Sequence, residues 1–169
     1  MKADLYSSGV RAFERGLAGL GSILRRGMAH AAEHSIPEVE LLGARLYPDM
    51  YPLHRQAQIV CDFARQAPSR VLEIEVPPAL EGVMDHAELQ TQIALARQFL
   101  AGLSPEQFEG RDERTISFPI GPNPTSQSAA RYVVGFATPN FYFHLATAYG
   151  ILRSRGVPLG KADYFGVGS

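Results

Sequence analysis

The chain has 169 residues, of which 46% are hydrophobic and 20% are charged, an ordinary balance for a globular protein of one domain. A chain of this length buries about two-thirds of the surface that its unfolded form exposes, so folding requires no disulfide or structural metal. Sixteen basic and seventeen acidic residues leave a formal net charge of -1. This charge argues against a nucleic-acid partner, because protein surfaces that bind nucleic acid concentrate positive charge.

Helix-type spacing of apolar residues begins near the start of the chain. Residues 4–34 carry apolar side chains three and four positions apart, which predicts a first long helix. The glycines within it weaken the helix, and close approach of another helix would offset that cost. A cap followed by a proline at residues 35–38 then predicts a short connecting helix that ends near Leu46.

Two further helices are predicted in the middle of the chain. Asp49 is placed to cap a second long helix that extends toward Val71. Pro68 lies inside this pattern and is expected to kink the helix or end it early, because proline lacks the backbone N–H. Asp85 and Glu88 have the spacing of a capping box, which predicts the start of a third helix.

The pattern changes at residues 111–128, where apolar and polar residues alternate around a Gly-Pro-Asn-Pro turn and predict a short β-hairpin or an ordered loop. Residues 129–154 return to helical spacing, with Pro139 either bending one long helix or dividing a short lead-in from the main helix. The tail from Gly160 is expected to be extended. The predicted fold class is all-α: a four-helix bundle with a hairpin or loop insertion before the last helix, in a single domain that spans residues 1–169.

The last helix carries the most informative polar side chains. Asn140 and His144 are one helical turn apart beside an apolar stripe, so they can reach the same point in space. His54 and Gln58 have the same spacing on the second long helix. If the two helices are neighbours, these side chains face each other across the core, as ligands do in bundle metal sites. Two imidazoles fall short of the three protein ligands of catalytic zinc unless Gln58 or an aspartate such as Asp49 joins them.

A purely structural explanation of these residues remains open. A histidine at a helix edge can simply be hydrogen-bonded within the fold. Phe141, Tyr142 and Phe143 can belong to the core or to an interface, or they can form the wall of a small-molecule pocket. No glycine-rich phosphate loop, nucleophile elbow or zinc-protease motif is present.

The cysteine content and the hydropathy pattern bear on location. Cys61 is the only cysteine, so no internal disulfide can form, and it has no activating base beside it in sequence. A chain without disulfides suits a reducing compartment. No segment approaches the run of about 18 apolar residues that crosses a bilayer. We therefore expect a cytoplasmic protein with no membrane partner.

Three sequence runs resemble one known family. They are RLYPDMYPL at residues 45–53, followed by Gln56 and Gln58; GFATPNFYFH at residues 135–144; and GVPLGK at residues 156–161. In order and spacing they are similar to the domain-of-unknown-function family 1993 (DUF1993), a relative of the DinB and YfiT group of metalloenzyme-like proteins. The resemblance extends over nearly the whole chain and implies a DinB-like four-helix bundle, often dimeric.

The resemblance also implies a location for a metal site. Many DinB-like proteins hold a divalent metal with three histidines, one from helix two and two from helix four, and some relatives are thiol-dependent transferases or isomerases. In this register His144 corresponds to the second histidine of helix four, whereas Asn140 replaces the first, and the helix-two ligand is His54 or Gln58. An amide oxygen binds zinc poorly, so a harder ion, a substrate contact through the amide or an empty polar pocket are the alternatives.

The sequence thus predicts a pocket between helices two and four that binds a small molecule and a divalent metal, zinc or nickel. Its expected metal ligands are His54 and His144, and its expected ligand-binding residues are Asp49, Gln58, Asn140 and Tyr142. The alternative is a non-catalytic homodimeric module with a degenerate metal site. A homodimer is expected in either case, and whether the protein is an enzyme stays open.

Overall fold

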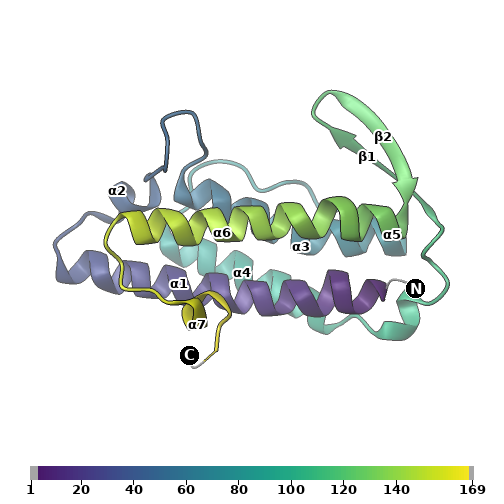
Figure 1. Cartoon of the computed structure of the whole chain (residues 1–169), viewed down its shortest axis with the longest axis horizontal. Helices are drawn as coiled ribbons and strands as arrows, with labels where there is room; N and C mark the ends of the chain where they lie inside the picture. Colours follow the sequence, from purple (N-terminus) through teal and green to yellow (C-terminus); the bar gives the residue numbers. More distant parts are fainter. Residues whose placement is uncertain (1–3, 168–169) are drawn as a thin grey trace.

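Four long helices lie side by side in the computed structural model, which describes residues 4–167 (Figure 1). They are α1 (Ala12–Glu33), α3 (Leu53–Leu72), α4 (His86–Ala101) and α6 (Thr138–Ser154). Helices α1 and α3 each pack against both α4 and α6. The apolar stripes of all four helices therefore meet in one core, as their periodicity predicts.

Shorter elements join the four long helices. The chain is therefore mostly helical, but it contains more helices than the four of the predicted bundle. They are α2 (Glu38–Leu42), a 3-10 turn (Pro105–Phe108), strands β1 (Thr115–Ile120) and β2 (Asn123–Ser128), α5 (Ala129–Tyr132), α7 (Lys161–Tyr164) and π-helical turns at Ser7–Arg11 and Val133–Ala137. The two strands form the expected antiparallel hairpin, in which Thr115 pairs with Ser128. The hairpin rises from one end of the long helices (Figure 1). The ring of Phe118 anchors it by packing against the ring of Tyr132, with 4.6 Å between the ring centroids.

Close contact between α1 and α6 depends on glycine. The Phe141 ring of α6 stacks on Phe13 of α1 with 4.5 Å between centroids, and both side chains are fully buried. A Cβ atom added to Gly16 would lie 2.3 Å from a carbon of the Phe141 ring. The absence of a side chain at Gly16 therefore lets the two helices approach, which explains a residue that otherwise weakens α1.

The start of α3 differs from the expectation, and so does one of the two outcomes expected at Pro68. Asp49 does not cap α3, because the helix begins at Leu53 after Pro52, and Asp49 is exposed in the preceding loop. Pro68 does not end α3 early, since the helix continues to Leu72. The kink that was the other expected outcome stays a prediction, and the missing N–H removes one backbone hydrogen bond.

The tail is also different from the expected extended arm. Residues after Gly160 form the short helix α7, whose first turn is capped by Asp163 accepting a hydrogen bond from the Gly160 N–H at 2.7 Å. Within residues 4–167, no helix has both the length and the apolar character that crossing a membrane requires.

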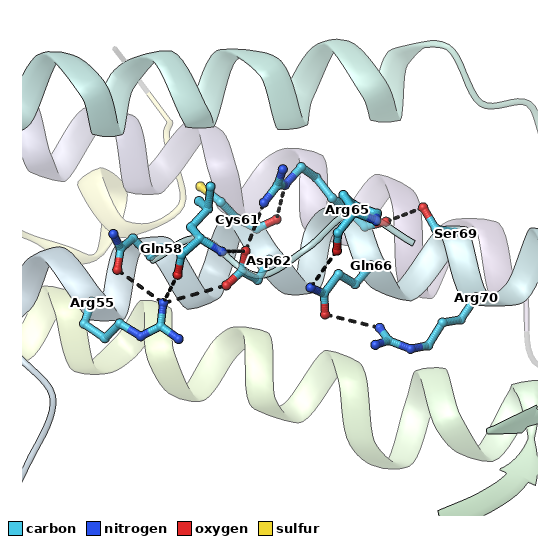
Figure 2. A network of polar contacts seen from close by, with 10 residues as sticks. Arg55, Gln58, Cys61, Asp62, Arg65, Gln66, Ser69 and Arg70 are labelled. Carbon is cyan, nitrogen blue, oxygen red and sulfur yellow. Dashed lines mark hydrogen bonds and ion pairs between the residues drawn. The ribbon is translucent and has the colours of Figure 1, made fainter. Parts of the chain in front are cut away.

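The connection between α3 and α4, residues 73–85, lies along α3 and is fastened to it by polar side chains (Figure 2). Gln66 donates to the carbonyl of Pro77 at 3.0 Å, and Gln58 donates to the carbonyl of Gly82 at 2.9 Å. Asp62 accepts from the N–H of Leu80 at 2.9 Å. These side chains supply the hydrogen bonds that the irregular backbone of the connection cannot make within itself.

Candidate functional site

A chain of hydrogen bonds, called the relay below, joins His144 of α6 to Gln56 of α3 and to Tyr51 in the loop before α3. Nδ1 of His144 lies 2.6 Å from Oε1 of Gln56, and Nε2 of Gln56 donates to the carbonyl of Tyr51 at 3.1 Å. The Tyr51 carbonyl can only accept, so it sets the orientation of the Gln56 amide. The amide oxygen also only accepts, so Nδ1 of His144 carries the ring hydrogen. Nε2 is left with a lone pair and has no hydrogen-bond partner in the described part of the chain.

The environment keeps this imidazole neutral. Burial lowers the pKa of His144 to about 4, and the nearby Arg55 guanidinium adds to the shift. At neutral pH the ring is therefore uncharged and can accept a hydrogen bond at Nε2, although a pKa this low makes it a weak general base.

We expect His144 to lower the free energy of unfolding of the protein at acidic pH. Its pKa is 6.5 without the fold and about 4 within it, so between these values only the unfolded state binds the proton, and the free energy of unfolding falls as the pH falls. His144→Gln keeps a donor for Gln56 but does not titrate. From pH 7 to pH 4.5 the wild type should lose about 1–2 kcal/mol more than the variant in urea unfolding, allowing for partial exposure of the ring. Equal losses in both proteins would contradict this assignment.

Asn140 and Tyr142 are used elsewhere in the fold. The Asn140 amide donates to the carbonyl of Phe136 in the preceding turn at 2.7 Å, not to His144. The Tyr142 hydroxyl donates to the carbonyl of Ala12 at 3.1 Å, which ties α6 to α1. The structure therefore places Tyr142 against α1, not α3. Binding of a ligand by either residue stays a prediction.

His54 and His144 are not brought together, although α3 and α6 are neighbours as expected. His54 precedes Gln56 by two residues, and each residue turns the helix by about 100°, so the two side chains leave α3 about 200° apart. Gln56 takes the side that contacts His144. His54 takes the opposite side, against α2 and the end of the α3–α4 connection.

Gln58 serves the α3–α4 connection. Its side chain is fully buried and donates to the carbonyl of Gly82. It also accepts from Arg55 at 3.2 Å (Figure 2). Every face of the amide is thus occupied by protein groups. Asp49 lies exposed outside α3, so the side chains expected to share one pocket are spread over separate places.

The residues around His144 do not fit the zinc or nickel site that the resemblance implies. The groups that the α3 and α6 positions offer there are the amides of Gln56 and Asn140, and neutral amides are poor partners for these metals. Among residues 4–167, no group of three or more histidine, cysteine, aspartate or glutamate side chains has the arrangement to hold a metal ion.

A cavity lies on the His54 side of α3. It has a volume of about 480 Å³ and is bounded by α2, the first turn of α3, and residues 83–88. Val39, Leu42, Val83 and Met84 contribute apolar side chains to its wall, and His54 contributes an imidazole. Small-molecule sites in proteins have this size and this mixture of apolar wall and few polar groups.

His54 has an unsatisfied nitrogen at this cavity. Its Nδ1 is buried and finds no hydrogen-bond partner in the described residues. Burial, with smaller effects from Arg45 and Arg55, lowers the pKa of His54, so the ring is neutral at physiological pH. A buried polar atom without a partner costs about 1–3 kcal/mol. Such a cost is explained if a ligand supplies the missing partner.

Comparison with known proteins agrees with this fold. The family model for DUF1993, a domain of unknown function, matches residues 5–165. The chain belongs to the DUF1993 family. This DUF1993 chain is also similar to the crystal structure of a DinB family member protein from Shewanella denitrificans, with 34% sequence identity and a TM-score of 0.87 over 95% of this chain and 91% of that chain. None of the curated proteins matches it.

Gln56 is the site residue that the sequence analysis missed. The sequence runs that resemble DUF1993 include it, and its spacing from apolar residues could have identified it as a core position. Leu53 and Val60 lie three residues before it and four after it, and both are fully buried, so Gln56 is a polar residue in the core stripe of α3. The cavity had no comparable signal, because residues 83–88 reach α2 only through the tertiary fold.

Proposed function

We propose that this DUF1993 protein is a DinB-like helical bundle that binds a small organic molecule in the cavity beside His54, without a metal ion. The observation that carries the proposal is that His54 lines a largely apolar cavity while its buried Nδ1 lacks a hydrogen-bond partner among residues 4–167. A molecule with an apolar body and one polar group would fill the cavity and satisfy this nitrogen.

The relay at His144 supports a role without metal. In DinB-like proteins this helix position supplies a metal ligand, but among residues 4–167 no group of three or more histidine, cysteine, aspartate or glutamate side chains could hold a metal ion. Nε2 can accept a hydrogen bond from a neutral molecule, and the neutral ring adds no positive charge. A homodimer and a cytoplasmic location stay predictions, and the proposal depends on neither.

Replacing His54 tests the proposal. His54→Phe removes both ring nitrogens and keeps an aromatic ring, so we expect folding stability to be unchanged or raised by up to about 1 kcal/mol, since an unsatisfied polar atom is lost. Binding of 2-phenylethanol, a small apolar alcohol, should weaken at the same time. A gain in stability with a loss of binding is typical of a functional residue that is costly to the fold.

The measurement is a nitrogen–proton NMR titration of the labelled protein with 2-phenylethanol, paired with thermal unfolding. In the wild type, the largest shifts should fall on residues lining the cavity, such as Leu42 and Met84. His86→Phe is a matched control: His86 also has a buried, unpartnered Nδ1 but does not line the cavity. Identical binding to wild type and His54→Phe, or shifts elsewhere in the protein, would refute the proposal.

A further inference from the structure

We infer that the cavity selects organic cations, that is, molecules that join an ammonium group to an apolar body. This inference rests on the proposed function and adds the chemical class of the ligand. Three carboxylates line the cavity besides His54 and the apolar wall: Glu38 from α2, and Asp85 and Glu88 from the start of α4. No lysine or arginine lines it.

The negative charges of the three carboxylates are not neutralised by ion pairs within the described part of the chain. Among the ion pairs of residues 4–167, none involves Glu38, Asp85 or Glu88. Each uses one oxygen for a backbone N–H at the start of α4. Glu38 Oε1 accepts from His86 at 2.6 Å, Asp85 Oδ1 from Glu88 at 2.8 Å, and Glu88 Oε2 from Asp85 at 2.8 Å. The backbone contacts orient the carboxylates, and the second oxygen of each makes no hydrogen bond to the described residues.

Charge at this end of α4 is therefore negative overall. The N-terminus of a helix is equivalent to about half a positive charge, whereas three carboxylates surround this one. Asp85 and Glu88 form the capping box of α4, and Glu38 of α2 accepts a further N–H at the start of this helix, that of His86. Capping therefore brings three negative charges together against about half a positive charge. An anionic ligand would be repelled, and a cation would be attracted.

His54 adds no opposing charge to the lining of the cavity. Burial lowers the pKa of its imidazole, so the ring is neutral at pH 7. Arg45 and Arg55 lie near His54, but both are held by the protein and neither lines the cavity. Arg45 donates to the carbonyl of Met50, and Arg55 donates to the carbonyl of Leu80. The apolar wall then covers the body of the ligand.

Three probes of similar size separate charge from shape: 2-phenylethylammonium, 2-phenylethanol and 3-phenylpropanoate, each titrated at pH 7 and low salt by NMR and calorimetry. We expect the ammonium to bind about tenfold more tightly than the alcohol and the carboxylate to bind most weakly, because unpaired carboxylates favour a cation over a neutral group. Raising the salt concentration should reduce the difference between ammonium and alcohol.

Amide variants assign the preference to particular residues. Glu38→Gln and Glu88→Gln each keep an acceptor oxygen for the backbone, so α4 stays capped. Each should weaken binding of the ammonium by about threefold to tenfold and leave the alcohol unchanged. Glu40→Gln is the control, since Glu40 is exposed on α2 as Glu38 is, but does not line the cavity.

The outcomes distinguish the two proposals. If ammonium and alcohol bind the cavity equally, or if neither Glu38→Gln nor Glu88→Gln changes the ammonium affinity, the inference of a cation site is overturned while the proposed function stands. If none of the three probes binds at the cavity, both are overturned.

Discussion

Asp62→Ala should reduce the free energy of unfolding by about 3 kcal/mol, because it removes one partner of a buried charged pair. The Asp62 side chain is nearly buried on α3, pairs with Arg65 at 2.9 Å and accepts from the N–H of Leu80 at 2.9 Å (Figure 2). Without the carboxylate, the Arg65 guanidinium and the Leu80 N–H both lose their partners beneath the α3–α4 connection. Urea unfolding of the two proteins measures the loss.

Two further variants serve as controls for Asp62→Ala. Asp62→Asn keeps an oxygen for Leu80, and the pKa of Asp62 is raised by burial, so holding the charge there is already costly. The loss should accordingly be smaller than for alanine. Glu81→Ala changes an exposed side chain of the same connection and should cost less than about 0.5 kcal/mol. A loss below about 1 kcal/mol for Asp62→Ala would show that other contacts hold the connection in place.

The same substitution is expected to affect the cavity. Leu80 precedes Val83 and Met84 by only a few residues, and both of these form part of the cavity wall. Loosening the connection should therefore weaken binding of the 2-phenylethanol probe, even though Asp62 does not line the cavity. This effect links the buried polar groups of α3 to the site that we propose.

The second large effect is a gain of zinc binding in Gln56→His/Asn140→His. The Gln56 side chain already reaches Nδ1 of His144 at 2.6 Å, so an imidazole at position 56 can share a metal with it. Position 140 lies one turn before His144 on α6, within reach of the same ion. Three imidazoles with an open fourth position are a catalytic type of zinc site. We expect the wild type to retain no stoichiometric zinc and the double variant to bind one ion per chain.

Elemental analysis of protein purified without a histidine tag measures the zinc content, and zinc should raise the melting temperature of the double variant alone. Adding His144→Ala to the double variant should abolish the gain. Stoichiometric zinc in the wild type would contradict the inference that the residues around His144 do not fit a zinc site.

Local spacing in the sequence was enough to predict the elements. The stripe of Phe141, Leu145 and Leu152 identified the core face of α6, and all three are buried as expected. The capping box at Asp85 and Glu88 marked the start of α4 correctly. These features depend on residues three or four apart, whose distances within a helix are set by its geometry. The same reasoning left a kink or an early end open at Pro68, and the helix continues to Leu72, which excludes the early end.

The candidate site was only partly predictable. His144 was correctly singled out as a polar residue beside an apolar stripe, but its partner was not identified. Gln56 lies on the core face of α3, while His54 lies about 200° away around the helix axis. Spacing along one helix does not tell which face meets α6, so His54 and Gln58 were equally plausible partners until the packing was known.

The sequence by itself determined which segments of this DUF1993 chain become the four long helices, because those outcomes depend on neighbours in the chain. Only the tertiary structure decided that His144 meets Gln56, that Gln58 fastens the α3–α4 connection, and that His54 opens onto a cavity with Glu38. Each of these contacts joins residues far apart in the chain. Their formation depends on how each helix is rotated and seated against its neighbours, which the burial of all four apolar stripes settles together.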